Sequence, residues 1–374
     1  MKNDALSFPI LIDGYRDART IKALAKRIRE EAEQINRQVK VMEVCGGHTH
    51  VIAKYGLHQL LPENIQFVHG PGCPVCIMPK ERIDHAYILS QMKDTIIVTL
   101  GDMMKVPGSL GSLFESRARG ADVRFIYSPM DTLEIAKNNP FKTIIFFAIG
   151  FETTTPMTAA LIKRQLDEKI ENIMYHINHV TVPEPMEAVM ASEDCSIDAF
   201  IAPSHVSVIT GAKIYQPLAD KYSMPIVVSG FEPVDIMESL WMIARQFREG
   251  RSSLEIQYTR GVSMEGNVQA QRMTERFFEK SVSFRWRGIG DIPGSSLRLK
   301  DEFSFLDAEK KYSLPGESID DHKLCICGEI LKGKAKPFEC TAFGKACTPQ
   351  NPLGACMVSE EGSCAAYHRY GKFI

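Results

Sequence analysis

The sequence predicts an α/β protein built from two consecutive α/β/α units, whose mainly parallel sheets face a cleft, and a cysteine-rich C-terminal region. Short apolar runs alternate with amphipathic helical stretches over most of the chain, which is typical of parallel sheets with crossover helices. The 374 residues exceed what one hydrophobic core usually organises. Six of the ten cysteines fall between Cys325 and Cys364, which sets the last region apart.

Runs rich in Val, Ile and Phe, each bounded by turn residues, predict eight strands. The expected strands are residues 39–44, 65–69, 95–100, 123–127, 143–149, 173–177, 199–202 and 226–228. Apolar residues at helical spacing predict helices in the gaps between them. The clearest expected helices are residues 18–38, 80–92, 157–169 and 234–248.

We expect three domains, with a boundary between the two α/β units near residues 130–140. Residues 1–130 would form the first unit, residues 131–258 the second, and residues 259–374 the cysteine-rich domain. The tripeptide GFE follows an apolar strand twice in the predicted second unit, at residues 150–152 and again at residues 230–232.

Composition excludes several classes of protein. The formal net charge of -2 gives no basic surface of the kind that nucleic-acid binding requires. No run approaches the roughly 20 apolar residues that a membrane span needs. The N-terminal residues have too short an apolar run for a signal peptide, so we expect a cytoplasmic protein. In a reducing cytosol, clustered cysteines favour metal ligation or thiol chemistry over structural disulfides.

Unusual residues gather where the predicted strands end. Since the carboxyl ends of parallel strands line the ligand crevice of such sheets, these turns should converge on a cleft between the units. The turns in question are residues 45–50, 69–76, 101–102, 150–156 and 203–207.

Cys45 precedes two glycines and a helical pattern, so its sulfur should lie at a helix N-terminus. The helix dipole and free N–H groups favour a thiolate there, and His48 or His50 could add positive charge or bind metal beside it. The alternative interpretation is a buried cysteine in a tight turn.

Cys73 and Cys76 form a C-x-x-C pair in a Gly-Pro-rich loop between a strand and a helix. Such a pair can close a reversible disulfide, because the spacing brings both sulfurs together. It can equally supply two thiolates to a metal. In the second unit, Thr153, Thr154 and Thr155 precede a helix and could bind an anion or a nucleotide phosphate.

The C-terminal region has little apolar patterning, so bound metal would supply its folding free energy. Its cysteines lack the close C-x-x-C pairs of zinc knuckles, whereas iron–sulfur clusters accept wider spacings. Both metals remain candidates on spacing alone. The six cysteines are Cys325, Cys327, Cys340, Cys347, Cys356 and Cys364.

Together these motifs resemble the HypD family of NiFe-hydrogenase maturation factors, and the resemblance runs essentially from end to end. The motifs that carry it are MEVCGGHTH at residues 42–50, GPGCPVC at residues 70–76, GFETT at residues 150–154 and PSHVS at residues 203–207.

The resemblance implies a 4Fe–4S cluster with ligand spacing C-x12-C-x6-C-x16-C. In this sequence that spacing selects four cysteines and leaves Cys325 and Cys356 outside. The implied cluster ligands are Cys327, Cys340, Cys347 and Cys364.

The resemblance also implies a scaffold on which an iron with two cyanides and one carbon monoxide, Fe(CN)2CO, is assembled together with a HypC-type partner. A HypE-type protein would deliver cyanide transiently. Cys45 would hold the iron with support from His48, while Cys73 and Cys76 would relay electrons from the cluster or hold iron. Such a protein is an assembly scaffold with an electron-transfer role rather than a conventional turnover enzyme.

Two other functions fit the residues. A stand-alone thiol-disulfide reductase would pass electrons from an iron–sulfur cluster to Cys73 and Cys76, leaving Cys45 incidental. A zinc-stabilised α/β binding protein would have no redox role. These alternatives differ in what they predict for Cys45, for partner dependence and for iron content.

Overall fold

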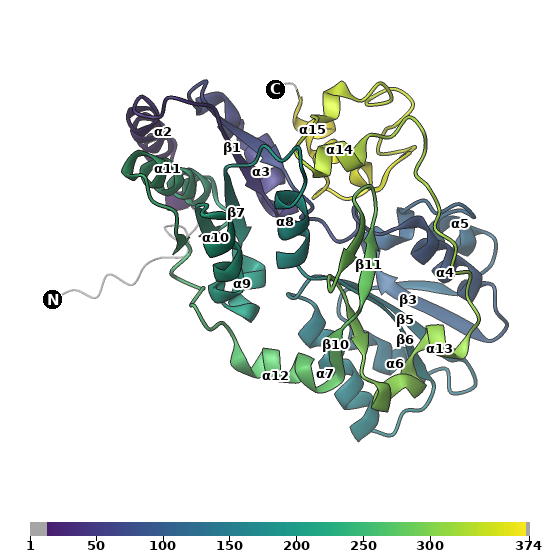
Figure 1. Ribbon diagram of the computed structural model, residues 1–374. Coiled ribbons are helices and arrows are strands. Elements are labelled where there is room, and N and C mark those ends of the chain that lie inside the picture. The colour runs from purple at the N-terminus through teal and green to yellow at the C-terminus, as the bar shows by residue number, and fades with distance from the viewer. Residues whose placement is uncertain (1–12, 372–374) are drawn as a thin grey trace.

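The computed structural model describes residues 13–371 and contains two parallel sheets, which confirms the predicted α/β class (Figure 1). Sheet A has the order β2 (Ile65–His69), β1 (Val39–Glu43), β7 (Ala199–Pro203), β8 (Ile226–Ser229) and β9 (Leu254–Ile256). Sheet B has the order β4 (Val123–Ile126), β3 (Thr95–Leu100), β5 (Thr143–Gly150) and β6 (Ile173–His179).

The two sheets are not consecutive along the chain. The chain forms β1 and β2 of sheet A, then all of sheet B, and returns to sheet A with β7, which pairs with β1. The boundary predicted at residue 130 falls between β4 and β5, and both strands pair with β3. Alternating strand and helix patterns predict parallel strands but not which strands become neighbours, because backbone pairing carries no side-chain signature.

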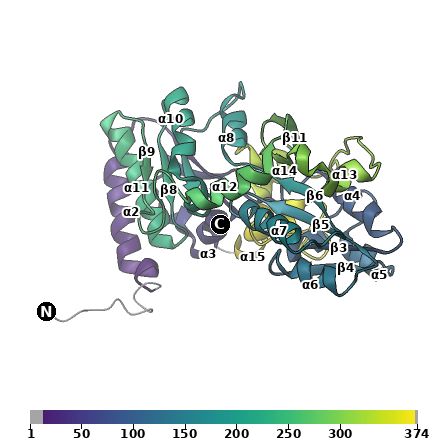
Figure 2. The ribbon, with the colours of Figure 1, turned by 90° about the horizontal axis from the view of Figure 1, so that it is seen from below.

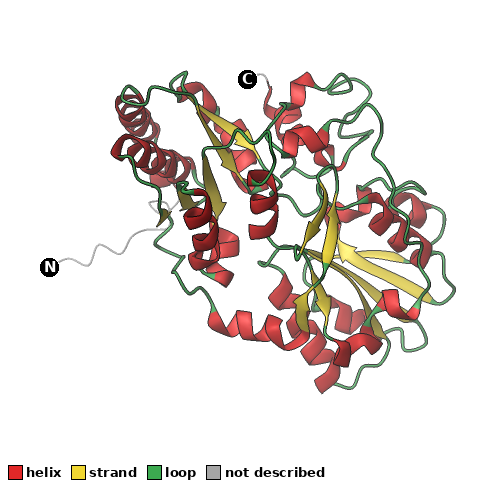
Figure 3. Ribbon diagram, in the orientation of Figure 1, coloured by secondary structure: helices red, strands yellow, loops and turns green. Residues whose placement is uncertain are grey.

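Helices cover both faces of each sheet (Figure 3). On sheet A, α2 and α11 pack together over one face, and their apolar stripes, which include Ile28 and Ile243, are fully buried there. Figure 2 shows these two helices side by side at the edge of the molecule. The helices of this lobe are α2 (Ala18–Ala32), α3 (Gly46–Tyr55), α9 (Ser204–Thr210), α10 (Gln216–Tyr222) and α11 (Pro233–Glu249).

The second lobe is built around the most apolar strands of the chain. Every residue of β6 is buried, as is every residue of β5 after Thr143, which is typical of a parallel sheet covered on both faces. The helices that follow or flank these strands are α4 (Lys80–Ser90), α5 (Leu113–Ala118), α6 (Asp131–Lys137), α7 (Thr155–Asp167) and α8 (Pro183–Met190).

The remaining segment consists of short elements, with α12 spanning the two lobes (Figures 1 and 2). Two antiparallel pairs join β10 (Phe278–Lys280) to β13 (Leu297–Leu299) and β11 (Ser283–Trp286) to β12 (Gly290–Pro293). The helices are α12 (Val268–Phe277), α13 (Ala308–Lys311), α14 (Cys327–Leu331) and α15 (Ser363–Tyr370). Seven short 3-10 helices complete the described chain: Gly14–Arg16, Leu57–Leu60, Gly101–Lys105, Ala212–Tyr215, Asp301–Leu306, Pro337–Glu339 and Ala355–Met357.

The segment that carries α14 and α15 lies across the top of both lobes (Figure 1). Its helix α15 packs on α3, the helix that follows the first strand of sheet A. Between residues 13 and 371, the structure has no helix with the length and apolar character that a bilayer crossing requires. Most of the N-terminal segment on which the expected cytoplasmic location depends lies outside the described residues.

Candidate functional site

Cys45 occupies the turn between β1 and α3, as its two following glycines predict. Its backbone is extended and forms the N-cap of α3, and its side chain is half-buried. A side chain at Gly72 would clash with the backbone of Cys45, and one at Gly46 would clash with Glu361. Glycine at these two positions therefore lets two other segments approach the Cys45 turn closely.

A cavity of about 560 Å³ opens beside Cys45 between the two sheets. The turns that follow β1, β3, β5 and β7 all contribute to its wall, so the carboxyl ends of strands from both sheets meet there, as expected for parallel sheets. Ser359 and Glu361, from the segment before α15, also line it. Polar residues in the wall include Cys45, Asp102, Thr153, Thr154, His205, Ser359 and Glu361.

The electrostatics around Cys45 differ from the sequence-based expectation. Burial raises the pKa of the Cys45 thiol well above its usual value, and the carboxyl groups of Glu361 and Glu43 raise it further. Hydrogen bonds from the first N–H groups of α3 act in the opposite direction and are weaker. Cys45 is therefore a thiol until a cation replaces its proton, and the expectation of a free thiolate is wrong.

His48 is fully buried and does not supply a positive charge. Its Nε2 lies 3.0 Å from the carbonyl oxygen of Gly230, and its ring stacks on Phe231 with centroids 4.5 Å apart. Burial lowers the pKa of His48 to about 4, so the imidazole is neutral near pH 7. Nδ1 has no partner among the described residues. His48 thus ties α3 to the end of β8 and positions the turn that carries Cys45.

The threonines after β5 divide between the cavity and their own turn. Thr153 and Thr154 line the cavity, whereas Thr155 is buried. The hydroxyls of Thr154 and Thr155 both donate to the carbonyl oxygen of Phe151, at 3.1 Å each. Beside them, burial raises the pKa of the Glu152 carboxyl to about 7. This turn places the N-terminus of α7 at the cavity.

The C-x-x-C pair is buried immediately behind this cavity. Cys73 and Cys76 are 3% and 1% exposed, and the N–H of Cys76 donates to the Cys73 sulfur at 3.3 Å. Their neighbours Pro74 and Val75 belong to the cavity wall. Burial, followed by hydrogen bonds to two other cysteines, raises the pKa of the Cys76 thiol. The pair is close enough for disulfide exchange and shielded from solvent.

Five C-terminal cysteines converge on a second, small apolar pocket, and the residues there fit a metal–sulfur centre. The Sγ atoms of Cys325 and Cys327 lie 3.1 Å apart. The N–H of Leu353 points at the Cys347 sulfur at 3.4 Å, and a side chain at Gly354 would approach within 2.5 Å of the Cys325 sulfur. The cysteines that line the pocket are Cys325, Cys327, Cys340, Cys347 and Cys364.

The predicted ligand set is thus brought together, but Cys325 joins it. Four thiolates complete a 4Fe–4S site, and this pocket offers five. The choice between Cys325 and Cys327 stays a prediction, while Cys340, Cys347 and Cys364 are common to both possible sets.

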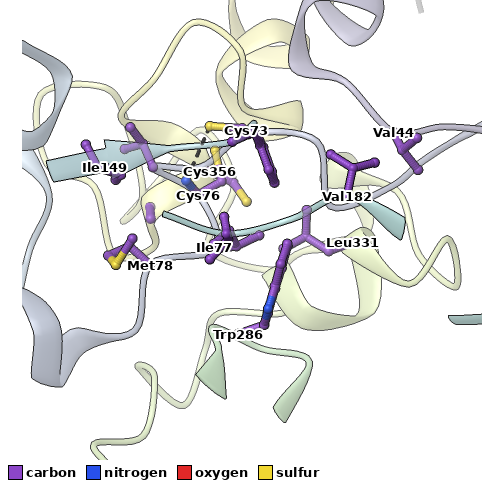
Figure 4. Close-up of a cluster of buried hydrophobic side chains, with 14 of the residues drawn as sticks. Val44, Cys73, Cys76, Ile77, Met78, Ile149, Val182, Trp286, Leu331 and Cys356 are labelled. Carbon is purple, nitrogen blue, oxygen red and sulfur yellow. Dashed lines mark hydrogen bonds between the residues drawn. The ribbon is translucent and has the colours of Figure 1, made fainter. Parts of the chain in front are cut away.

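Cys356, like Cys325, lay outside the ligand set that the sequence implied. It is fully buried, and its sulfur accepts hydrogen bonds from Cys327 and Cys76, which lower the pKa of Cys356 to about 6. Figure 4 shows its sulfur beside those of Cys73 and Cys76. The two sulfur sites, separate in sequence, are therefore joined by one chain of thiols. In the sequence, the one indication of a role for Cys356 was that it is a cysteine beyond the four needed for the cluster.

The chain is similar to known proteins over nearly its whole length. The family model described as HypD, hydrogenase formation hypA family, matches residues 19–371. The hydrogenase maturation factor HypD of Azotobacter vinelandii is 45% identical over 367 residues, covering 96% of this chain and 97% of the relative. HypD of Cupriavidus necator is 42% identical over 369 residues, covering 97% of each protein. HypD of Escherichia coli is 41% identical over 363 residues, covering 96% of this chain and 97% of that protein.

The matches cover nearly the whole chain, so the matched range includes the cavity residues, the C-x-x-C turn and the C-terminal cysteines. The chain belongs to the HypD family of hydrogenase maturation factors.

Proposed function

We propose that this protein is the scaffold on which the Fe(CN)2CO group of NiFe hydrogenase is assembled, in complex with a HypC-type partner and with cyanide delivered by a HypE-type protein. The observation that carries this proposal is the position of Cys45. Its thiol lies in the wall of a cavity of about 560 Å³, large enough to admit a ligated iron and a partner side chain.

The cavity suits an anionic iron group. Cys45 supplies a soft sulfur ligand, which can hold iron while strong-field ligands are added. The N-termini of α3 and α7 meet at the cavity, where their N–H groups can donate to the nitrogen or oxygen atoms of such ligands. Because the thiol pKa is raised, iron binding releases a proton from Cys45.

The C-terminal pocket would hold a 4Fe–4S cluster on Cys327, Cys340, Cys347 and Cys364. When bound, such a cluster supplies one electron at a time. A second possible set has Cys325 in place of Cys327, because both sulfurs line the pocket and lie 3.1 Å apart.

The thiol chain gives electrons a path between the two sites. Closing a disulfide between Cys73 and Cys76 releases two electrons and two protons, and opening it consumes them. Cys356 contacts Cys76 on one side and Cys327 on the other, so it bridges the C-x-x-C pair and the C-terminal pocket. The cavity lies directly in front of this pair.

A second candidate function is a stand-alone thiol-disulfide reductase located in the cytoplasm. The observation that favours it is the thiol chain itself, which runs from the C-terminal pocket to Cys73 without involving Cys45. This function requires neither a partner nor an iron group in the cavity. A zinc-stabilised protein would lack both the colour and the iron of a cluster.

Anaerobic co-purification with the HypC-type partner, followed by infrared spectroscopy, separates these functions. We expect cyanide and carbon monoxide bands in the wild-type complex and their loss in Cys45→Ala. Cys195→Ala is the matched control, because Cys195 is also half-buried but contacts Met190, away from the cavity. Bands of normal intensity in Cys45→Ala contradict the scaffold and favour the reductase.

A further inference from the structure

A buried carboxyl group holds the Cys45 turn from below. Glu43, the last residue of β1, is fully buried and accepts the backbone N–H of Cys45 at 3.1 Å. It also accepts the hydroxyl of Thr49 from α3 and lies 2.6 Å from Nδ1 of His69. Three donors from three segments therefore converge on Glu43, and the position of Cys45 depends on where this carboxyl group lies.

His69 carries this interaction to the C-terminal segment. Nδ1 of His69 faces the Glu43 carboxyl group, so Nε2 on the other side of the ring is free to bond the C-terminal segment. The hydroxyl of Tyr367 lies 2.9 Å from that Nε2, within hydrogen-bond distance. The ring of Tyr367 meets the imidazole edge to face, with centroids 5.2 Å apart, which orients both side chains.

Tyr367 belongs to the helix that carries a cysteine of the C-terminal pocket. Cys364 and Tyr367 are three residues apart on α15, so they lie on neighbouring positions of one helix face. The segment just before α15 touches the same turn from above, where Glu361 packs on Gly46. The C-terminal segment therefore contacts the Cys45 turn at two points, one of them through a continuous line of hydrogen bonds.

We propose that Tyr367, His69 and Glu43 are positioning residues that couple the two sulfur sites, so that cluster assembly at the C-terminal pocket precedes and organises iron binding at Cys45. This inference rests on the cluster proposed above. Metal binding contributes folding free energy to a segment with few regular elements. Ordering α15 fixes the Tyr367 hydroxyl and, through His69 and Glu43, the N–H of Cys45. A turn that is already ordered binds its next ligand at a lower entropic cost.

Hydrogen exchange of the full chain, measured by mass spectrometry before and after cluster reconstitution, tests this coupling. In the wild-type protein we expect reconstitution to slow exchange of peptides covering residues 43–49 by about tenfold. Tyr367→Phe removes one hydroxyl and leaves the cysteines untouched. It should load the cluster normally, judged by iron content and visible absorption, yet lose most of this slowing.

Tyr370→Phe is the matched control, since it removes a hydroxyl from the same helix. Within residues 13–371 that hydroxyl lies 3.4 Å from Nε2 of His50 and forms no hydrogen bond with His69. It should keep the slowing. His69→Gln breaks the line from the sheet side and should behave as Tyr367→Phe. Equal slowing in Tyr367→Phe and wild type overturns the coupling, as does unchanged exchange in a fully loaded wild-type protein. Failure of the wild type to take up iron and sulfide instead overturns the proposed cluster.

Discussion

The sulfur of Cys356 accepts a hydrogen bond from the thiol of Cys76, although the two residues are far apart in the sequence. This contact makes the C-x-x-C turn and the C-terminal cysteines neighbours in the folded protein. Hydrogen bonds from Cys327 and Cys76 hold the pKa of the Cys356 thiol below its usual value, which favours the thiolate, the species that attacks a disulfide.

Cys356→Ala should therefore separate the two sites without removing the cluster. We expect a normal iron content and visible spectrum, because Cys356 lies outside the pocket that the other C-terminal cysteines line. With excess dithionite as the source of the two electrons, reduction of a Cys73–Cys76 disulfide in the reconstituted protein should slow by at least about tenfold, since the adjacent thiolate is lost. Acid quenching followed by alkylation and mass mapping measures this rate. An unchanged rate in Cys356→Ala removes Cys356 from the path.

Cys325→Ala and Cys327→Ala form a matched pair that decides the cluster ligands. The predicted set requires Cys327→Ala to lose the cluster and Cys325→Ala to retain about four irons and four sulfides per chain. Anaerobic reconstitution with iron, sulfide and zinc analysis distinguishes the two variants. The opposite pattern assigns the fourth ligand position to Cys325 and leaves Cys327 as the exchange partner of Cys356.

Removing His48 should change how stability depends on pH. In the folded protein the pKa of His48 is about 4, below the value of about 6.5 expected in the unfolded chain. The unfolded chain therefore binds more protons between pH 4 and pH 6.5, so the neutral, buried His48 loses stability as pH falls through this window.

The cost of acidification from pH 7 to pH 5 due to His48 should be on the order of 2 kcal/mol. Between pH 7 and pH 5, the free energy of unfolding of His48→Gln should fall by about that much less than that of the wild type. Chemical denaturation at the two pH values measures both changes. Because each protein is compared with itself at two pH values, any pH-independent effect of the substitution on stability cancels. Equal pH dependence in both proteins would show that folding does not lower the pKa of His48.

Close packing behind Cys45 should make Gly72→Ala costly. An added methyl group would collide with the backbone of Cys45, so the turn must shift, at a cost of about 1–3 kcal/mol in the free energy of unfolding. Gly101→Ala is the control in the same cavity wall, because no atom lies within 4 Å of its added methyl group. Infrared bands of the partner complex should weaken only in Gly72→Ala. A stable Gly72→Ala protein with normal bands contradicts the required fit.

Local patterns predicted most of this site. The placement of Cys45 at the start of α3 follows from an apolar strand, two glycines and a helical pattern, all of which are adjacent in the chain. Strands β2 and β3 match their predicted bounds, because each is also a short apolar run marked by neighbouring residues in the chain. The strands β9 to β13 were missed because three or four partly exposed residues show no clear alternation.

The contacts that sequence reasoning missed are those that tertiary packing creates. Nothing near Cys356 indicates that Cys76 will lie beside it, and nothing near Glu43 indicates Tyr367. The charge of His48 was misjudged because burial dominates its pKa, and burial depends on Phe231 and β8, which are distant in the chain.

The order of strands in sheet A also bears on how the chain folds. Sheet B is formed by one continuous segment, so its contacts are local and it can fold as soon as that segment has been synthesised. The pairing of β1 with β7 must instead close a long loop, which is slow. Until β7 arrives, β1 keeps an unpaired, apolar edge that can associate with other chains. We therefore expect misfolding of this protein to begin from sheet A rather than from sheet B.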